Sequence, residues 1–415
     1  MRVLLVVNIV LPKVAHLINR ESAVTGGWLS EIIEGVSKKE NIKLAVATPY
    51  EGNDLKHFSV DNVDYYFLPR RNLYDVFDDD CHKIFDSFQP DLLHIEGSEF
   101  KHANTFINCW DGENVLSLQG IVNGIEPYYF GGLSIKKLLF SFKIPELFAA
   151  ISLLIKKRVF RSRLIWEQDT IGKAKNLLGR TNWDLAHARK FNLNANYYKA
   201  NRILRDPFYN NEWDISNAEK YSIYIGNSYQ PIKGFHFVIE AVHKLKKKYP
   251  KIKIYVAGIS PYDNKVKRNI IKNGYAYYLR KMIERNSLDQ NFIFLGSINA
   301  EEVASKLRKV HVYCLASAIE NSPNTLGEAM LLGVPSVASF VGGVSDMASD
   351  NHEALLYRYD EVDVLVNQIS RIFDDDDLAI KLSKNAREKA RVTHSKMINI
   401  DSIINCYRDI YKQQT

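Results

Sequence analysis

Two glutamates, Glu320 and Glu328, stand in one stretch of the chain with seven residues between them. The apolar run 310–315 before them reads as a buried strand, and Gly333 after them is typical of a helix end. The stretch therefore predicts a strand, a loop that carries Glu320, and a helix that carries Glu328 in its second turn. Both carboxylates could then reach one ligand that lies across the start of the helix.

The residues between the two glutamates predict how that helix begins. Ser322 is expected as its N-cap, and Pro323 as the first helical residue, where a missing N–H costs nothing. The free amides around Asn324 and Thr325 could then bind a phosphate, because helices that follow parallel strands bind anions at their N-termini. Taken alone, however, the stretch fits better with a capped helix that carries two surface glutamates.

Short β-rich runs alternate with helix-length amphipathic segments along the whole chain. This alternation is typical of α/β proteins, in which crossover helices connect parallel strands. The predicted strands are 2–8, 42–48, 63–68, 91–95, 115–118, 176–180, 221–226, 252–257, 292–295, 310–315 and 336–339. Helices such as 235–248 and 266–285 are expected between them.

We predict two α/β domains, residues 1–205 and 206–394. Asp206-Pro207 and a polar stretch interrupt the periodicity near the boundary. Two last helices are expected at about 378–391 and 397–411, and the C-terminal one, about 395–415, could cross back onto the first domain. The length of 415 residues agrees with two to three units of ordinary size.

The composition is that of a folded globular chain. It is 46% hydrophobic and 25% charged, which excludes disordered and fibrous classes. The longest uncharged apolar stretch, 147–155, is too short to cross a membrane. The four cysteines have no metal-type spacing and are too few to stabilise the chain as disulfides, so a reducing cytosol is expected.

A basic segment, 128–166, stands out within the net charge of +7. Between positions 136 and 163, the sequence has eight Lys and Arg residues and a single acidic residue, Glu146. Apolar residues form a helical stripe among them: Leu147, Phe148, Ile151, Leu154 and Ile155. We expect this segment to lie on an anionic membrane surface, with an ordinary core helix as the alternative.

Several motifs together are similar to family 4 retaining glycosyltransferases of the GT-B fold. The Glu-x7-Glu pair and the residues 322–329 between and after the two glutamates resemble that family's signature. Gly333-Val334-Pro335 and the Gly342-Gly343 turn resemble it as well. The stretches 224–236, 89–97 and 25–28 resemble its donor loop, its fourth strand and its first glycine loop. The resemblance covers nearly the whole chain and implies two Rossmann-like doubly wound domains that face a central cleft.

The resemblance implies roles for the donor residues. Glu320 would lie near the hydroxyls of the donor sugar, Glu328 would bind the ribose, and Lys233 would neutralise the departing diphosphate with help from the helix N-terminus. The other donor-binding residues are expected to be Asn324, Thr325, Leu326, Ser322, Gly26, Gly27, Asn227 and Arg205. Family members often have an arginine before the lysine, and here Arg180 or Arg205 could replace it.

On the acceptor side the sequence departs from the family. Gln119 stands where a histidine is common, and it can donate or accept a hydrogen bond but cannot take up a proton at neutral pH. Gly120, Glu96 and Arg180 are the further acceptor-side candidates, with a structural role for Glu96 an equal alternative. His94 lies inside a predicted strand and is expected to be structural.

These observations predict a retaining glycosyltransferase that moves a sugar from a nucleotide diphosphate donor, expected to be UDP-linked, to a lipid-linked or polysaccharide-precursor acceptor. No metal and no other cofactor is expected. The alternatives are a UDP-sugar 2-epimerase of the same fold and a catalytically silent nucleotide-sugar-binding or scaffold module. Nucleic-acid binding is the last alternative, and no nucleic-acid partner is expected. The predicted location is the cytoplasm, at the inner face of the cytoplasmic membrane.

Overall fold

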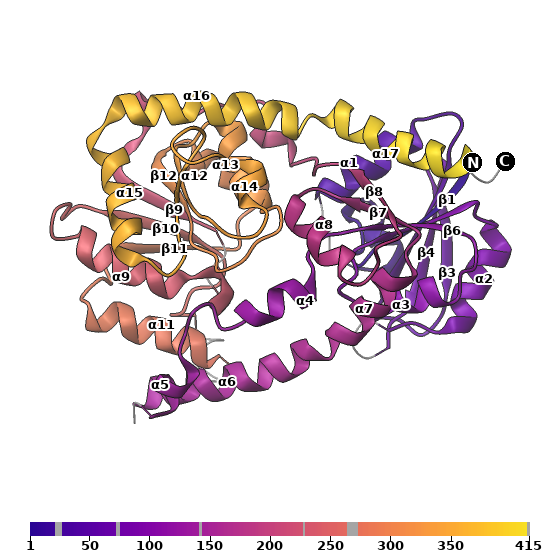
Figure 1. The fold of residues 1–415 in the computed structure, drawn as a ribbon, viewed down its shortest axis with the longest axis horizontal. Coiled ribbons are helices and arrows are strands. Elements are labelled where there is room, and N and C mark those ends of the chain that lie inside the picture. Colours follow the sequence, from indigo (N-terminus) through magenta and orange to yellow (C-terminus); the bar gives the residue numbers. More distant parts are fainter. Residues whose placement is uncertain (21–26, 72–74, 141–142, 227–228, 264–272, 413–415) are drawn as a thin grey trace. The chain divides into compact units, whose positions relative to one another are not determined.

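The computed structural model describes residues 1–20, 27–71, 75–140, 143–226, 229–263 and 273–412. The chain divides into two compact units (Figure 1). The first comprises Met1–Gly124, Ser162–Leu204 and His394–Thr415, and the second comprises Ile125–Arg161 and Arg205–Thr393.

The first unit is built on an eight-stranded sheet of order β3-β4-β2-β1-β5-β6-β7-β8. All neighbouring strands are parallel except the edge pair β3–β4. The strands are β1 (Arg2–Val6), β2 (Lys43–Tyr50), β3 (Lys56–Val60), β4 (Val63–Pro69), β5 (Leu92–Glu96), β6 (Glu113–Ser117), β7 (Asn176–Gly179) and β8 (Asn196–Lys199). Central strands such as β1 are almost wholly buried, as expected for a parallel sheet covered on both faces.

Helices cover both faces of this sheet. Leu29 of α1 and Tyr407 of α17 pack in the core on one face, and Ile84 of α2 and Phe106 of α3 pack in the core on the other. The last helix of the chain therefore belongs to the first unit. The helices are α1 (Gly27–Ser37), α2 (Asp78–Phe88), α3 (Lys101–Asn108), α4 (Val122–Ile125), α7 (Arg163–Lys173), α8 (Asn182–Arg189) and α17 (Lys396–Lys412).

The second unit is built on a six-stranded parallel sheet of order β11-β10-β9-β12-β13-β14. Its strands are β9 (Glu219–Ile225), β10 (Lys253–Ala257), β11 (Phe292–Gly296), β12 (Val310–Leu315), β13 (Ser336–Ser339) and β14 (Leu355–Tyr357). Its helices are α5 (Ile135–Phe140), α6 (Ile144–Arg161), α9 (Phe235–Leu245), α11 (Gly274–Arg285), α12 (Ala300–Leu307), α13 (Asn324–Leu332), α14 (Val344–Met347), α15 (Val362–Asp374) and α16 (Asp376–Thr393).

The strand order reverses once in each sheet, between β1 and β5 in the first unit and between β9 and β12 in the second. Ligands of doubly wound proteins bind in the crevice outside the carboxyl ends of such strand pairs. Among the candidate residues, Glu96 ends β5, and the loop after β12 carries Glu320 and Ser322. The predicted α/β class with two Rossmann-like sheets is thus confirmed.

Residues 125–161 correct the expected division of the chain, which placed them in the first domain. Here α6 lies along α11 of the second unit (Figure 1). The two helices approach so closely that a Cβ atom on Gly274 would lie 2.0 Å from the carbonyl oxygen of Phe148. Glu146 and Arg285 add an ion pair of 2.6 Å between the same two helices.

All eleven predicted strands are present, but three others were not predicted: β3, β8 and β14. The strands β3 and β8 lie at sheet edges and are partly exposed, so their sequences lack a long apolar run. The strand β14 has only three residues. Within the described part of the chain, no helix is long and apolar enough to cross a membrane.

Candidate active site

The turn that carries Lys233 is fixed against the loop after β12. It is a single 3-10 turn, Pro231–Lys233, that ends at Gly234 with φ of +67°. A Cβ atom on Gly234 would lie 1.9 Å from the carbonyl oxygen of Ala316, so only glycine fits there. The amide of Ala318 donates to the carbonyl of Ile232 at 2.7 Å, which ties the two loops together.

This arrangement brings Lys233 and Glu320 into contact. Lys233 Nζ lies 2.6 Å from Glu320 Oε1, and Ser317 Oγ donates to the same oxygen at 2.6 Å. The Glu320 backbone is also held, because the amide of Gly343 donates to its carbonyl at 3.0 Å. A cation and a carboxylate thus stand together at the carboxyl ends of the two central strands.

The helix α13 begins one residue later than expected. Asn324 is its first residue and Pro323 its N-cap, so Ser322 does not cap the helix; its hydroxyl contacts Met347 Sδ at 3.7 Å. Thr325 lies in the first turn, where Tyr313 Oη donates to its hydroxyl at 2.8 Å. The first amides of a helix have no carbonyl four residues before them in the helix, so those of Asn324 and Thr325 can bind an anion.

Leu326 follows Thr325 in the first turn of this helix. Its side chain is fully buried, and its amide donates to the carbonyl of Pro323 at 3.1 Å. The side chain thus anchors the helix in the core, and the donor-binding role of Leu326 stays a prediction.

Glu328 is buried and paired with Arg205. Arg205 Nε and Nη2 donate to the two carboxylate oxygens at 2.7 Å and 2.8 Å, the bidentate geometry that suits a guanidinium. Burial raises the pKa of Glu328, and Arg205 opposes that rise. A carboxylate oxygen has two lone pairs, so each oxygen can accept a ligand hydroxyl while it keeps its arginine.

Two of the candidate donor residues, Gly26 and Asn227, lie outside the described residues. Gly27 is the first residue of α1. Trp28 follows it, and the guanidinium carbon of Arg202 lies 3.4 Å from the centre of its ring.

The acceptor-side candidates come together in the first unit, at the carboxyl ends of β5, β6 and β7. Gln119 Nε2 donates to the carbonyl of Glu96 at 3.4 Å, and Arg180 Nη1 donates to the carbonyl of Gln119 at 3.4 Å. The amide of Gly120 donates to Glu99 Oε1 at 3.0 Å. These residues form one polar cluster, although the chain separates them widely.

Glu96 and His94 are both buried in this cluster. Glu96 is buried beside Arg202 at 2.9 Å and Arg180 at 3.8 Å. Burial would raise its pKa, but Arg202, His94 and Arg180 together lower it. His94 contacts Tyr407 Oη at 2.5 Å and Ser117 Oγ at 2.7 Å, and burial lowers its pKa to about 4, which agrees with the structural role expected of it.

Three further residues of the cluster were not predicted: Glu99, Glu167 and Arg202. Burial raises the pKa of Glu99 to about 7. Glu167 accepts the amides of Val122 and Asn123, each at 2.7 Å, and thereby holds the start of α4. Glu99 follows Glu96 closely and could have been found from that spacing, whereas Arg202 and Glu167 join the cluster only through the fold.

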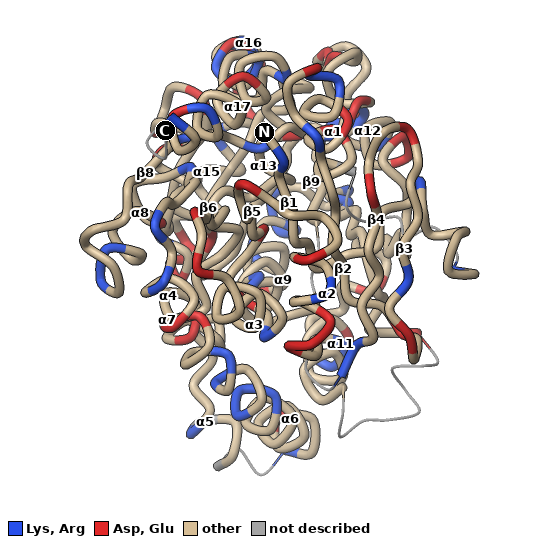
Figure 2. The backbone as a smooth tube through the Cα atoms, turned by 90° about the vertical axis from the view of Figure 1, so that its right-hand side faces the viewer, with Lys and Arg blue, Asp and Glu red and all other residues tan. Residues whose placement is uncertain are grey.

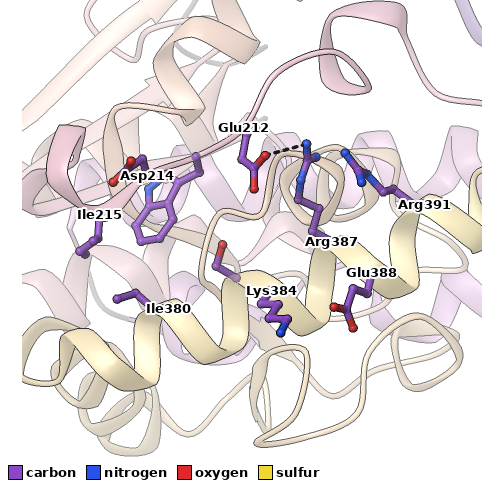
Figure 3. A pocket seen from close by; sticks show the side chains of 10 residues that line it. Glu212, Asp214, Ile215, Ile380, Lys384, Arg387, Glu388 and Arg391 are labelled. Atoms are coloured by element: carbon purple, nitrogen blue, oxygen red, sulfur yellow. Dashed lines mark hydrogen bonds and ion pairs between the residues drawn. The ribbon is translucent and has the colours of Figure 1, made fainter.

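A separate cavity of about 510 Å³ lies in the second unit between the segment 212–215 and α16 (Figure 3). Glu212 and Arg387 form an ion pair of 3.0 Å across it. None of the described residues that line this cavity belongs to the Lys233–Glu320 site, and its lining has both acidic and basic side chains. It therefore shows no preference for one kind of ligand.

Comparisons with known proteins show what this chain resembles. Residues 206–389 match the family model described as glycosyl transferases group 1. An alpha-1,4-N-acetyl-D-galactosaminyltransferase of Campylobacter jejuni is 29% identical over 25% of this chain and 29% of its own length. The putative colanic acid biosynthesis glycosyltransferase WcaL of Escherichia coli is 27% identical over 38% and 37%. The chain thus spans about a third of the length of these relatives.

Solved structures share the fold along the whole chain. A sucrose-phosphate synthase from Thermosynechococcus elongatus superposes with a TM-score of 0.74 over 100% of both chains, at 14% identity. The Anabaena protein HepE in complex with UDP superposes with a TM-score of 0.68 over 99% of this chain and 100% of its own, also at 14% identity. The fold is therefore the GT-B fold of glycosyltransferases.

Proposed function

We propose that this chain is a retaining glycosyltransferase that uses a nucleotide diphosphate sugar, with UDP as the nucleotide. The observation that carries the proposal is the meeting of Lys233 and Glu320 beside the N-terminus of α13, with the buried Glu328 further along that helix. The family match of residues 206–389 supports it, and the UDP complex of the structurally similar HepE supports the choice of nucleotide.

In the proposed reaction the bond between the sugar C1 and the diphosphate oxygen breaks. The acceptor oxygen bonds to C1 on the same face, and its proton passes to the departing diphosphate. Lys233 and the first amides of α13 stabilise the negative charge that develops on the diphosphate. Glu328 binds the ribose hydroxyls, and Glu320 contacts the sugar.

The same two features, a lysine and a helix N-terminus, supply the positive charge that a metal ion supplies in other transferases. We therefore propose that the reaction needs no metal. Arg205 is held by Glu328 and would act at the ribose end of the donor. Gln119, Gly120 and Arg180 of the first unit would contact the acceptor, which we propose to be a lipid-linked or polysaccharide-precursor glycan.

The test is the release of UDP from a panel of UDP-sugars, with GDP-sugars as the comparison, in the presence and absence of EDTA. We expect slow UDP release that EDTA does not change and that a glycan acceptor stimulates, with an NMR spectrum that shows retained anomeric configuration. Conversion to the 2-epimer would instead identify an epimerase. Donor binding without turnover under all these conditions would identify a silent module and overturn the proposal.

The exposed face of α6 supports a peripheral position on an anionic membrane. Ile144, Leu154, Ile155 and Val159 are exposed by 63%, 44%, 57% and 51% on this helix, while Ala149, Ala150 and Leu153 face the protein. Figure 2 shows Lys and Arg residues along the same helix. Apolar side chains between basic ones are typical of helices that lie in the membrane interface.

A further inference from the structure

The segment that joins α4 to α5 packs on the turn that carries Lys233. Gly131, with φ of +57°, is buried there against Pro231. A Cβ atom on Gly131 would lie 2.0 Å from the carbonyl oxygen and 2.4 Å from the carbonyl carbon of Pro231. Two backbones therefore meet at this point, with no flexible side chain between them.

The Lys233 turn is thus held by backbone contacts at both of its ends. Gly234 and Ile232 fix it to the loop after β12, and Gly131 lies against Pro231. Any group larger than a hydrogen atom at position 131 must displace either the turn or the segment that carries Gly131.

The segment that carries Gly131 is the more firmly anchored of these two backbones. The segment 125–161 is anchored elsewhere, by the close packing of α6 on α11 and by the pair of Glu146 with Arg285. Glu126 near its start is also paired, with Lys157 at 3.0 Å and Arg161 at 2.7 Å. The Lys233 turn has only three residues, and Ile232 and Lys233 are partly exposed.

We infer that Gly131 is a positioning residue for Lys233: its missing side chain lets the segment 125–133 set where the lysine ammonium stands. The inference rests on the proposed role of Lys233 at the donor diphosphate. A displacement of about 1 Å in a group that stabilises the transition state can reduce turnover by about a hundredfold.

The experiment compares Gly131→Ala with Gly132→Ala in the full-length chain. Gly132 also has a positive φ, +82°, but a Cβ atom there would meet the ring ends of Phe237 and Tyr359, which are partly exposed and can shift. The control therefore has the same kind of backbone strain without a clash against the turn. Turnover of the UDP-sugar, its KM, UDP affinity and the thermal unfolding midpoint are measured for both variants.

We expect kcat to fall about ten- to hundredfold in Gly131→Ala and less than about threefold in Gly132→Ala, at similar unfolding midpoints. The double variant Lys233→Ala with Gly131→Ala should have a kcat less than about twofold below that of Lys233→Ala alone, because the effects of residues that act as a unit are not additive. If Gly131→Ala fails to fold, Pro231→Gly serves instead, because it loosens the same contact from the side of the turn without adding an atom to it, and it should lower kcat in the same way.

The outcomes separate two failures. If Lys233→Ala is slow but Gly131→Ala keeps wild-type turnover, or if the two changes are additive, Gly131 does not act through Lys233 and this inference is wrong. If Lys233→Ala itself keeps wild-type turnover, the proposed role of the lysine is wrong.

Discussion

Lys233 Nζ lies 2.6 Å from Glu320 Oε1, so the cation expected to neutralise the donor diphosphate is itself neutralised by a carboxylate. Ser317 donates to the same oxygen and holds the carboxylate in place. A donor that enters this site must share the lysine with Glu320 or displace the Glu320 carboxylate from it. The pair therefore links the sugar end of the proposed site to its phosphate end.

Lys233→Ala should lower kcat by about a hundredfold, as for the loss of one preorganised charge-stabilising group. Stability should change little, because the side chain is partly exposed and lies on a turn. UDP release at saturating donor measures the effect. Lys248→Ala is the matched control, since Lys248 has an ion pair of the same length, 2.6 Å, with Asp374. Equal turnover of the two variants would contradict the assignment.

Glu320→Gln should lower kcat more than it changes the donor KM, if the contact of Glu320 with the sugar strengthens in the transition state. The same change removes the negative charge beside Lys233. UDP alone should then bind about tenfold more tightly, since a paired cation becomes available to the diphosphate. Calorimetric titration with UDP measures this, and unchanged or weaker UDP binding would show that the pair does not compete with the diphosphate.

Glu328→Gln should raise the donor KM about tenfold with a smaller change in kcat. Glutamine keeps one acceptor oxygen but loses the second, and hydrogen bonds to charged groups contribute about 1.5–3 kcal/mol each. Arg205 also loses one of its two bonds, so the unfolding midpoint should fall. Initial rates over a range of donor concentrations provide the measurement, and a change confined to kcat would refute a ribose role.

Glu99 should make the first unit less stable as pH rises. Its pKa is raised to about 7 in the folded chain from 4.5, mainly by burial, so the folded state favours the protonated acid. Relative to Glu99→Gln, the wild type should lose stability between about pH 4.5 and 7, by up to about 3 kcal/mol. Thermal unfolding of both proteins at pH 5 and pH 8 tests this. The unfolding midpoint of the variant should rise relative to that of the wild type between pH 5 and pH 8. A difference in midpoint that is the same at both pH values would show that Glu99 keeps an ordinary pKa.

Vesicles that contain anionic lipid should co-sediment with the protein at low salt and release it as salt rises. Leu154→Gln combined with Ile155→Gln should weaken binding, because these exposed side chains would enter the interface. Arg158→Gln tests the charge. Lys157 and Arg161 are less suitable because both pair with Glu126.

Val392→Gln is the control for the vesicle experiment, since Val392 is 67% exposed on α16. Donor hydrolysis should be unchanged in all of these variants. Wild-type protein that ignores anionic vesicles at low salt would defeat the membrane proposal.

The sequence by itself determined the alternation of strands and helices and the helix start near Glu320, and it marked Glu320, Glu328 and Lys233 as candidates. These features are local. Hydrophobic periodicity, N-terminal prolines and C-terminal glycines act within one or two turns of chain, so they can be read without knowledge of the fold.

The tertiary structure alone decided which groups are partners. Arg205 pairs with Glu328, and Arg202 with Glu96, across more than a hundred residues of sequence in each case. It also placed residues 125–161 in the second unit and left one side of α6 exposed. An apolar stripe fits a core or a surface equally well, because whether it is buried depends on an element from elsewhere in the chain that packs against it.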